Sequence, residues 1–176
     1  MSHLKQNSSF ELSSFEKFSM QKRIDPKLLE KEVEKIKSSG KTIATLNGSF
    51  DLLHAGHLQI IYEASLQADV LLVALNSDSS IKQYKSPLRP IIPLEYRLQM
   101  MSALGFVDYV TWFDETNPIE LLKKIKPHVH INGAEYGENC IEADVVRSNG
   151  GKIHIVSLVP GLSTSQIIQK IKETCV

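Results

Sequence analysis

Short apolar runs alternate along this chain with longer segments in which apolar residues recur at helical spacing. Five of the short runs have the length and composition of buried strands, at 41–46, 70–75, 109–113, 128–132 and 152–156. The amphipathic segments predict helices near 55–67, 93–104, 117–126, 139–149 and 163–173. This alternation predicts an α/β fold, namely a Rossmann-like parallel five-stranded sheet with helices on both faces, in a single domain.

The N-terminal region departs from this pattern. Residues 1–24 are polar apart from scattered phenylalanines, and we expect a loosely ordered arm; the alternative is that a partner or neighbouring subunit orders Phe10, Phe15 and Phe18. Asp25 precedes a proline, a pair typical of a helix start, which predicts a helix over 26–39. The alternating core then covers 41–172 within a domain of 25–176. Prolines in the basic segment 82–90 predict an irregular loop.

Composition excludes several classes of partner. The chain is 42% hydrophobic and 23% charged, and its 20 Lys and Arg balance 20 Asp and Glu, so neither nucleic acid nor an anionic membrane surface is an expected partner. No apolar run approaches the roughly 20 residues of a membrane helix, and the N-terminus lacks the apolar region of a secretory signal. Cys140 and Cys175 show no metal-ligand spacing and fit a reducing cytoplasm.

The segment 47–57 joins the first predicted strand to the helix that follows. It places His54 and His57 three residues apart at this junction. Ligands of open α/β sheets bind at strand ends, and the amides of a helix N-terminus favour anions. Two imidazoles beside such amides predict a phosphate site. Asp51, in the same segment, could hold the turn through side chain–backbone bonds.

The order G-x-F-D-x-x-H-x-G-H, from Gly48 to His57, resembles the signature of the nucleotidylyltransferase superfamily, in its cytidylyltransferase-like branch. The alternative is a pair of ordinary surface histidines, which the ten-residue frame disfavours. The resemblance implies that both histidines are catalytic: they bind the triphosphate and stabilise charge as pyrophosphate leaves. It also implies nucleotide contacts for the surrounding residues Asn47, Gly48, Ser49, Phe50 and Gly56, and a substrate contact for Asp51.

Two later segments are similar to further motifs of the same family. Residues 161–168 resemble its G-I-S-T-S motif, which implies phosphate contacts for Ser163, Thr164 and Ser165; Ser163 is also a natural helix N-cap. Residues 132–136 are similar to a segment beside the base and ribose, which implies nucleotide contacts for Asn132, Gly133 and Glu135. The heptose members of the family typically carry Lys and Asp in place of Asn132 and Glu135.

The basic segment resembles a phosphate-binding loop of the family. Lys85 corresponds to a lysine that contacts phosphate, and we assign it a catalytic role; Arg89 and Arg97 are assigned to substrate binding, with a structural ion pair as the alternative for Arg97. The remaining histidines, His128, His130 and His154, have no metal-ligand spacing and are interpreted as structural. No metal-binding side chains are predicted, and the expected cofactor is Mg²⁺ bound to the phosphates.

Shorter sequence matches favour one subgroup of the family over another. Cytidylyltransferases typically have an Arg where this chain has Leu158, whereas three short matches point to the bacterial heptose 1-phosphate adenylyltransferases: 76–78, Arg89 with Pro90, and 149–151. The resemblance therefore implies transfer of AMP from ATP to a heptose 1-phosphate, giving ADP-heptose for lipopolysaccharide core or related glycans. A cytidylyltransferase acting on glycerol 3-phosphate or another polyol phosphate, and a non-catalytic nucleotide-binding protein, stay open as alternatives.

The same subgroup implies two protein partners. A homodimer is expected from the family. The bifunctional members carry a kinase domain ahead of the transferase domain, and because this chain has no room for one, a separate sugar kinase is expected.

Overall fold

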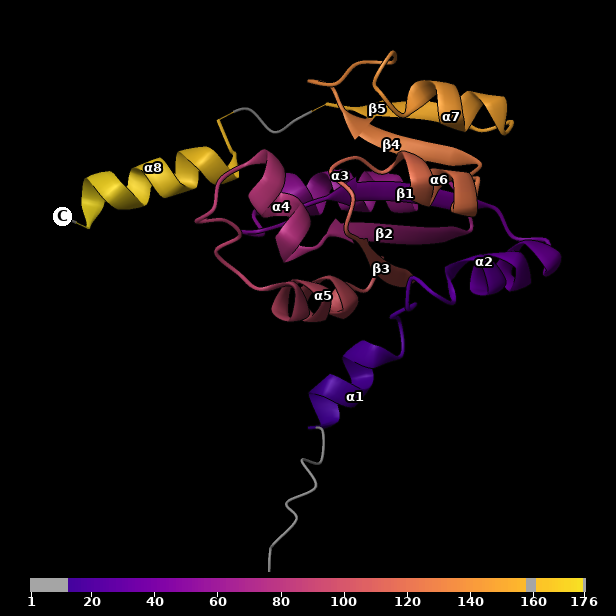
Figure 1. The fold of residues 1–176 in the computed structure, drawn as a ribbon, viewed down its shortest axis with the longest axis horizontal. Coiled ribbons are helices and arrows are strands. Elements are labelled where there is room, and N and C mark those ends of the chain that lie inside the picture. The colour runs from indigo at the N-terminus through magenta and orange to yellow at the C-terminus, as the bar shows by residue number, and fades with distance from the viewer. Residues whose placement is uncertain (1–12, 158–160, 176) are drawn as a thin grey trace, which may run out of the picture.

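Five parallel strands form the centre of the computed structural model, which describes residues 13–157 and 161–175 (Figure 1). Their order across the sheet is β3-β2-β1-β4-β5. This confirms the predicted parallel five-stranded sheet. The strands are β1 (Ile43–Gly48), β2 (Val70–Asn76), β3 (Tyr109–Phe113), β4 (Val129–Gly133) and β5 (Lys152–Val156).

Helices cover both faces because side chains of the central strands alternate between two apolar clusters. Ala44 and Leu46 of β1 pack with α3 (Ala55–Ser65) and α5 (Leu94–Ala103). Ile43 of β1 and Leu72 of β2 pack in a second cluster with the other helical layer. That layer contains α2 (Leu29–Ser38) and α6 (Ile119–Ile125), with α7 (Ala143–Ser148) against α6 and β5. None of the helices in the two described ranges is long and apolar enough to cross a membrane.

The sheet order creates a switch point between β1 and β4. The chain leaves β1 through α3 toward β2, and it leaves β4 through α7 toward β5, on the other side of the sheet. Right-handed crossovers place these two connections on opposite faces, so a crevice opens at the carboxyl ends of β1 and β4. The register pairs Leu46 with Ile131, which brings the segments after the two strands side by side.

Part of the predicted N-terminal arm is ordered, which corrects the expectation for residues 13–24. Helix α1 (Ser14–Met20) begins with a capping box in which Ser13 and Glu16 bond reciprocally. The following residues add to the open edge of β3, where Ile24 N–H donates to the Val110 carbonyl and becomes buried. Arg23 also pairs with Glu95 of α5 at 2.8 Å. These partners are distant in sequence, so local composition could not reveal them. Residues 1–12, Phe10 among them, lie outside the described residues.

The predicted loop 82–90 begins later than expected. Helix α4 (Asp78–Tyr84) includes residues 82–84, because Ser77 caps it by accepting from the Ser80 N–H at 3.2 Å and the prolines come only afterwards. The predicted N-terminal helix also starts late, at Leu29 rather than 26, and Asp25 instead accepts from the Lys27 N–H in the preceding turn. Leu158, which bears on the choice between subgroups, lies outside the described residues.

Candidate active site

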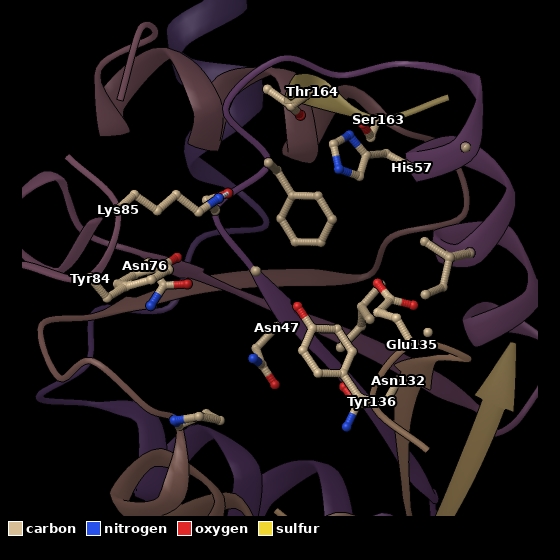
Figure 2. A pocket seen from close by; sticks show the side chains of 18 of the residues that line it. Asn47, His57, Asn76, Tyr84, Lys85, Asn132, Glu135, Tyr136, Ser163 and Thr164 are labelled. Carbon is tan, nitrogen blue, oxygen red and sulfur yellow. Dashed lines mark hydrogen bonds between the residues drawn. The ribbon is translucent and has the colours of Figure 1, made fainter. Parts of the chain in front are cut away.

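A cavity of about 470 Å³ lies at the switch point, a volume ordinary for a small-molecule site. Most of the residues predicted for the site line it, and Figure 2 shows them in three groups: near His57, near Lys85 and near Asn132. The lining residues with predicted roles are Asn47, Gly48, Ser49, Phe50, His54, Gly56, His57, Lys85, Asn132, Gly133, Glu135, Ser163 and Thr164. Segments from four parts of the chain therefore converge on one cavity.

His54 is the N-cap of α3. Its Nδ1 accepts a hydrogen bond from the backbone N–H of His57 at 3.3 Å. Because a backbone N–H can only donate, Nδ1 carries no proton, and in the neutral ring the proton is on Nε2. Partial burial lowers the pKa of His54, which favours this neutral form. The arrangement leaves an Nε2–H group to donate to an anionic ligand.

His57 stacks on His54 with ring centroids 3.8 Å apart, and Phe50 meets its ring edge-on at 5.3 Å. Burial, followed by the charge of His54, lowers the pKa of His57 to about 4. Its Nδ1 is buried without a hydrogen-bond partner among the described residues. The backbone of Leu52 interacts with the ring and opposes this pKa shift, but by distance and angle Nδ1 has no partner in the described part of the chain. Buried polar atoms are seldom left unpaired, so this nitrogen is a candidate for a ligand contact.

Close approach explains two glycines of the signature. A Cβ on Gly56 would lie 3.2 Å from the His54 ring and 3.7 Å from the Leu162 carbonyl oxygen. A Cβ on Gly48 would lie 3.1 Å from the Phe50 ring, and Phe50 itself has a positive φ of 44°. The missing side chain at position 56 therefore leaves room for the His54 ring, whereas its distance to Leu162, just before α8 (Thr164–Thr174), would be an ordinary contact.

The helix α8 presents its N-terminus to the cavity. Ser163 caps it by accepting from the Gln166 N–H at 3.2 Å, and both Ser163 and Thr164 line the cavity. The first amides of a helix lack intrahelical acceptors and carry a partial positive charge. Ser165 is exposed and does not line the cavity, so only its backbone is placed to contribute.

Lys85 adds a positive charge on the β2 side. Its Nζ donates to the Ser49 hydroxyl at 2.8 Å, which joins the segment after α4 to the segment after β1. Burial, followed by repulsion from Arg89, lowers the pKa of Lys85. Both effects would be relieved by a nearby anion.

Three residues predicted to bind substrate form a buried network instead. Asp51 is fully buried, pairs with Arg89 and accepts from the backbone N–H groups of Ile91 and Ile92 at 2.7 and 2.8 Å. Burial alone would raise the pKa of Asp51, but these bonds together lower it. None of the three lines the cavity, so the contacts seen here are structural and their substrate contacts stay predictions.

Arg97 is the centre of the same region and is 1% exposed. Its Nη1 donates to the carbonyls of Ser49 and Asn76 at 2.7 and 2.8 Å, and Nη2 pairs with Asp78 at 2.7 Å. One guanidinium therefore ties the segment after β1 to the segment after β2. Arg97 positions the cavity wall without touching the cavity.

Several lining residues were not predicted as site residues, although Asn76, Tyr136 and Leu162 lie in segments that resemble the family. Asn76 is the last residue of β2 and residues 116–118 lie shortly after β3, so their position at the carboxyl ends of strands could have indicated them. Tyr84, Tyr136, Ile141, Glu142 and Leu162 lie in or beside helices and loops with no such signal.

The buried histidines predict a pH dependence of stability. Burial lowers the pKa of His130 to about 4, as for His57, and an unfolded histidine has a pKa of about 6.5. Between these values the unfolded chain binds more protons, so the free energy of unfolding should fall as pH drops from 6.5 toward 4 and should not change through these groups above 6.5. For fully buried His130 alone, the fall in the free energy of unfolding over this pH range is on the order of 3 kcal/mol.

Urea unfolding at pH 7 and pH 4.5 tests this expectation. His130→Val should reduce the difference in unfolding free energy between the two pH values. An equal difference in both proteins would show that His130 titrates normally in the folded chain.

Comparisons with known proteins agree with the geometry. Residues 45–170 match the family described as cytidylyltransferase-like. The bifunctional protein HldE of Syntrophotalea carbinolica is 41% identical over 133 residues, which cover 75% of this chain and 27% of that protein. HldE of Geobacter metallireducens is 42% identical over 140 residues, covering 79% and 29%. The chain thus spans less than a third of the length of these relatives.

Two solved structures have a similar fold. A lipopolysaccharide core biosynthesis protein from Thermoplasma volcanium superposes with a TM-score of 0.55 and 26% identity, covering 68% of this chain and 98% of that one. Pantoate-beta-alanine ligase from Francisella tularensis, complexed with beta-gamma ATP and beta-alanine, superposes with a TM-score of 0.54. The match covers 87% of this chain and 78% of the ligase at 16% identity, which shows the fold alone.

Proposed function

Because the chain belongs to the cytidylyltransferase-like family, we propose that it transfers AMP from ATP to a heptose 1-phosphate, with release of pyrophosphate and formation of ADP-heptose. The observation that supports this most is the convergence of two helix N-termini, two imidazoles and Lys85 on one cavity. A triphosphate needs this concentration of donors and positive charge.

Sequence similarity supports the choice of ATP and a heptose. The HldE proteins are about 40% identical over three quarters of this chain or more, and a structural relative is described as a lipopolysaccharide core biosynthesis protein. An ADP-activated heptose would serve lipopolysaccharide core or related glycans. A reaction that consumes ATP would take place in the cytoplasm, and two free cysteines suit a reducing compartment.

The proposed reaction is an in-line displacement. A phosphate oxygen of the sugar forms a bond to the α-phosphorus of ATP, and the bond from that phosphorus to the bridging oxygen breaks, so that pyrophosphate leaves with the electron pair. The acceptor oxygen is already anionic, so no protein nucleophile is needed. The work of the protein is to position the reactants and neutralise charge.

Each group of the cavity has a part in this reaction. His54 would donate through Nε2–H, and the phosphates would raise the pKa of His57 and so favour a proton on its unpaired Nδ1. The amides at the start of α8, with Ser163 and Thr164, would hold the outer phosphates. Lys85 would contact the transferring phosphoryl group.

The acceptor would lie over the ends of β2 and β3. Asn76, Tyr84, Thr116 and Asn117 line this part of the cavity with neutral amide and hydroxyl groups. Such groups suit the hydroxyls of a sugar, and the phosphate of the sugar would face Lys85. Because the acceptor already carries a phosphate, a separate sugar kinase acting earlier is part of the proposal.

Mg²⁺ is the proposed cofactor. The described residues contain no cluster of three or more His, Cys, Asp or Glu side chains suited to a metal ion. The protein groups near the histidines are hydrogen-bond donors suited to phosphate oxygens, not metal ligands. This fits a Mg²⁺ ion that is held mainly by the phosphate oxygens. When bound, the ion would offset charge on the triphosphate.

A homodimer is also proposed. Helix α8 is amphipathic, has no buried residue and leaves Ile171 51% exposed. Phe15 and Phe18 of α1 are also about half exposed. These apolar side chains are surfaces that a second copy could cover, and light scattering of the purified protein would show whether it does.

Pyrophosphate release tests the proposed function. The protein is incubated with ATP or CTP and with heptose 1-phosphate, glycerol 3-phosphate or choline phosphate, with Mg²⁺ or with EDTA. We expect the fastest release with ATP, heptose 1-phosphate and Mg²⁺, and little release with EDTA. A preference for CTP with a polyol phosphate would establish the cytidylyltransferase alternative. Tight nucleotide binding without turnover for any pair would establish a non-catalytic protein.

A further inference from the structure

The cavity has an acidic end opposite its cationic one. His54, His57 and the start of α8 lie by β1, and Lys85 lies on the β2 side. The segment between β4 and α7 supplies the carboxylates Glu135 and Glu142. Neighbouring strands are about 4.8 Å apart and β1 lies between β2 and β4, so Lys85 and the carboxylates follow strands that are roughly 10 Å apart, with the histidines between them. Because carboxylates repel phosphates, an uncharged part of the ligand must occupy the acidic end.

The acidic end has two exposed apolar side chains. Tyr136 and Ile141 line the cavity, yet they are 65% and 62% exposed. An aromatic ring and an aliphatic side chain left open in this way can stack on a flat ring. Figure 2 shows Tyr136 facing the cavity beside Asn132 and Glu135. The nucleobase is the flat, uncharged part of a nucleoside triphosphate.

Glu142 is held in a fixed place at this end. It is 7% exposed, and its Oε2 accepts from Asn132 Nδ2 at 3.3 Å. Cys140 lies beside it, and burial, followed by a hydrogen bond with Glu142 and by the charge of that carboxylate, raises the pKa of the thiol. Within the described ranges no Lys, Arg or His pairs with Glu142. A buried carboxylate without a cation needs further hydrogen-bond donors.

Two amide oxygens at this end are further acceptors. The amide nitrogen of Asn132 is used by Glu142, which leaves its Oδ1 as an acceptor. Asn47 Oδ1 is buried without a partner among the described residues, and β1 pairs with β4 in a register that places Asn47 next to Asn132. A base that presents a hydrogen-bond donor would therefore find acceptors in Glu142 and in these two amide oxygens.

We propose that Glu142, positioned by Asn132, accepts a hydrogen bond from the exocyclic amine of the nucleobase and so selects adenine over bases that carry a carbonyl at that position. This rests on the proposed function only in taking the cavity as a nucleoside triphosphate site. Carboxylates pair with exocyclic amines and not with carbonyl oxygens, and a good contact of this kind discriminates by about 10- to 100-fold.

Matched nucleotide pairs test this selection. ITP differs from ATP by a carbonyl in place of the 6-amine, and UTP differs from CTP in the same way at position 4. Binding of each nucleotide is measured by calorimetry without an acceptor. Wild-type protein should bind ATP about 10- to 100-fold more tightly than ITP, and CTP more tightly than UTP. Equal affinities within each pair would overturn the proposal.

Substitution of Glu142 locates the effect. Glu142→Gln keeps the shape and an oxygen for Asn132, but its amide nitrogen can donate to a carbonyl, so the ATP-to-ITP ratio should fall at least tenfold. Glu138→Gln is the control, because Glu138 is exposed on the same segment and does not line the cavity; it should keep the wild-type ratio. Equal weakening of ATP and ITP by Glu142→Gln would mean a ribose contact or a packing role, and would contradict the proposal.

The two proposals fail separately. A protein that prefers ATP to ITP but releases no pyrophosphate with any sugar phosphate would contradict the proposed function and support base selection by Glu142. A protein that releases pyrophosphate equally well from ATP and ITP with a sugar phosphate would support the proposed function and contradict base selection by Glu142. Thermal unfolding of each variant shows whether it is folded, and the wild-type ratio tests the selection even if a variant is not.

Discussion

His57→Ala should lower kcat about 10²- to 10³-fold while the protein stays folded. The imidazole stacks on His54, and its Nδ1 is buried without a hydrogen-bond partner in the part of the chain that the structure describes. The cavity that it lines also receives the N-termini of two helices. Its loss removes one donor aimed at charge that develops in the transition state. Single-turnover pyrophosphate release, with Kd for ATP measured separately, would show whether the loss falls on turnover rather than on binding.

Two variants sharpen this result. His57→Gln replaces the ring by an amide that can still donate a hydrogen bond. It should therefore lose less turnover than His57→Ala if the ring acts by hydrogen bonding. His154→Ala is the control, since His154 lies on β5 and does not line the cavity; it should keep the wild-type rate. Wild-type turnover in His57→Ala would show that the histidine pair is not part of the active site.

Arg97→Met should destabilise the protein by about 3–5 kcal/mol. The side chain is 1% exposed, and its removal takes the guanidinium donor from the carbonyls of Ser49 and Asn76 and leaves Asp78 with the Leu94 N–H and solvent. For a chain of this length the loss corresponds to a decrease in Tm of about 6–20 °C. Activity should also fall, because Ser49 and Asn76 line the cavity.

The stability effect has a matched control and a chemical test. Arg147→Met removes an exposed guanidinium that donates to Glu138 and Asn139, so it should change stability by less than about 0.5–1 kcal/mol. Arg97→Lys keeps the charge, but an ammonium group cannot donate in all the directions that the guanidinium does. It should therefore recover only part of the lost unfolding free energy. A Tm for Arg97→Met equal to that of Arg147→Met would show that the buried network is not needed for stability.

Local patterns were sufficient for much of the fold. The strand runs and most helices were predicted within a few residues, because a buried strand and an amphipathic helix each leave a periodic signal in consecutive residues. The positions of His54 and His57 at a strand–helix junction, and of Ser163 at a helix start, were likewise local features. The convergence of these segments followed from a general property of parallel sheets, whose carboxyl ends lie at one edge.

Pairing over long sequence distances was not predictable in this way. Arg97 follows the basic segment 82–90, and Asp51 lies in the signature segment 48–57. The resemblance of these segments to the family suggested substrate contacts for both residues. Their actual partners are 48 and 40 residues away, at the Ser49 carbonyl and the Ile91 N–H. A charged side chain is either solvated or paired inside the protein, and its own sequence neighbourhood does not say which.

The order of strands and helices along the chain, and the chemistry at the junction after β1, follow from residues that are close together in the sequence. The spatial order of the strands, the docking of residues 22–24 on the edge of β3, and the acidic end of the cavity around Glu142 became visible in the folded molecule alone. Each of these depends on which distant surfaces meet, and that is settled by packing both faces of one sheet at once.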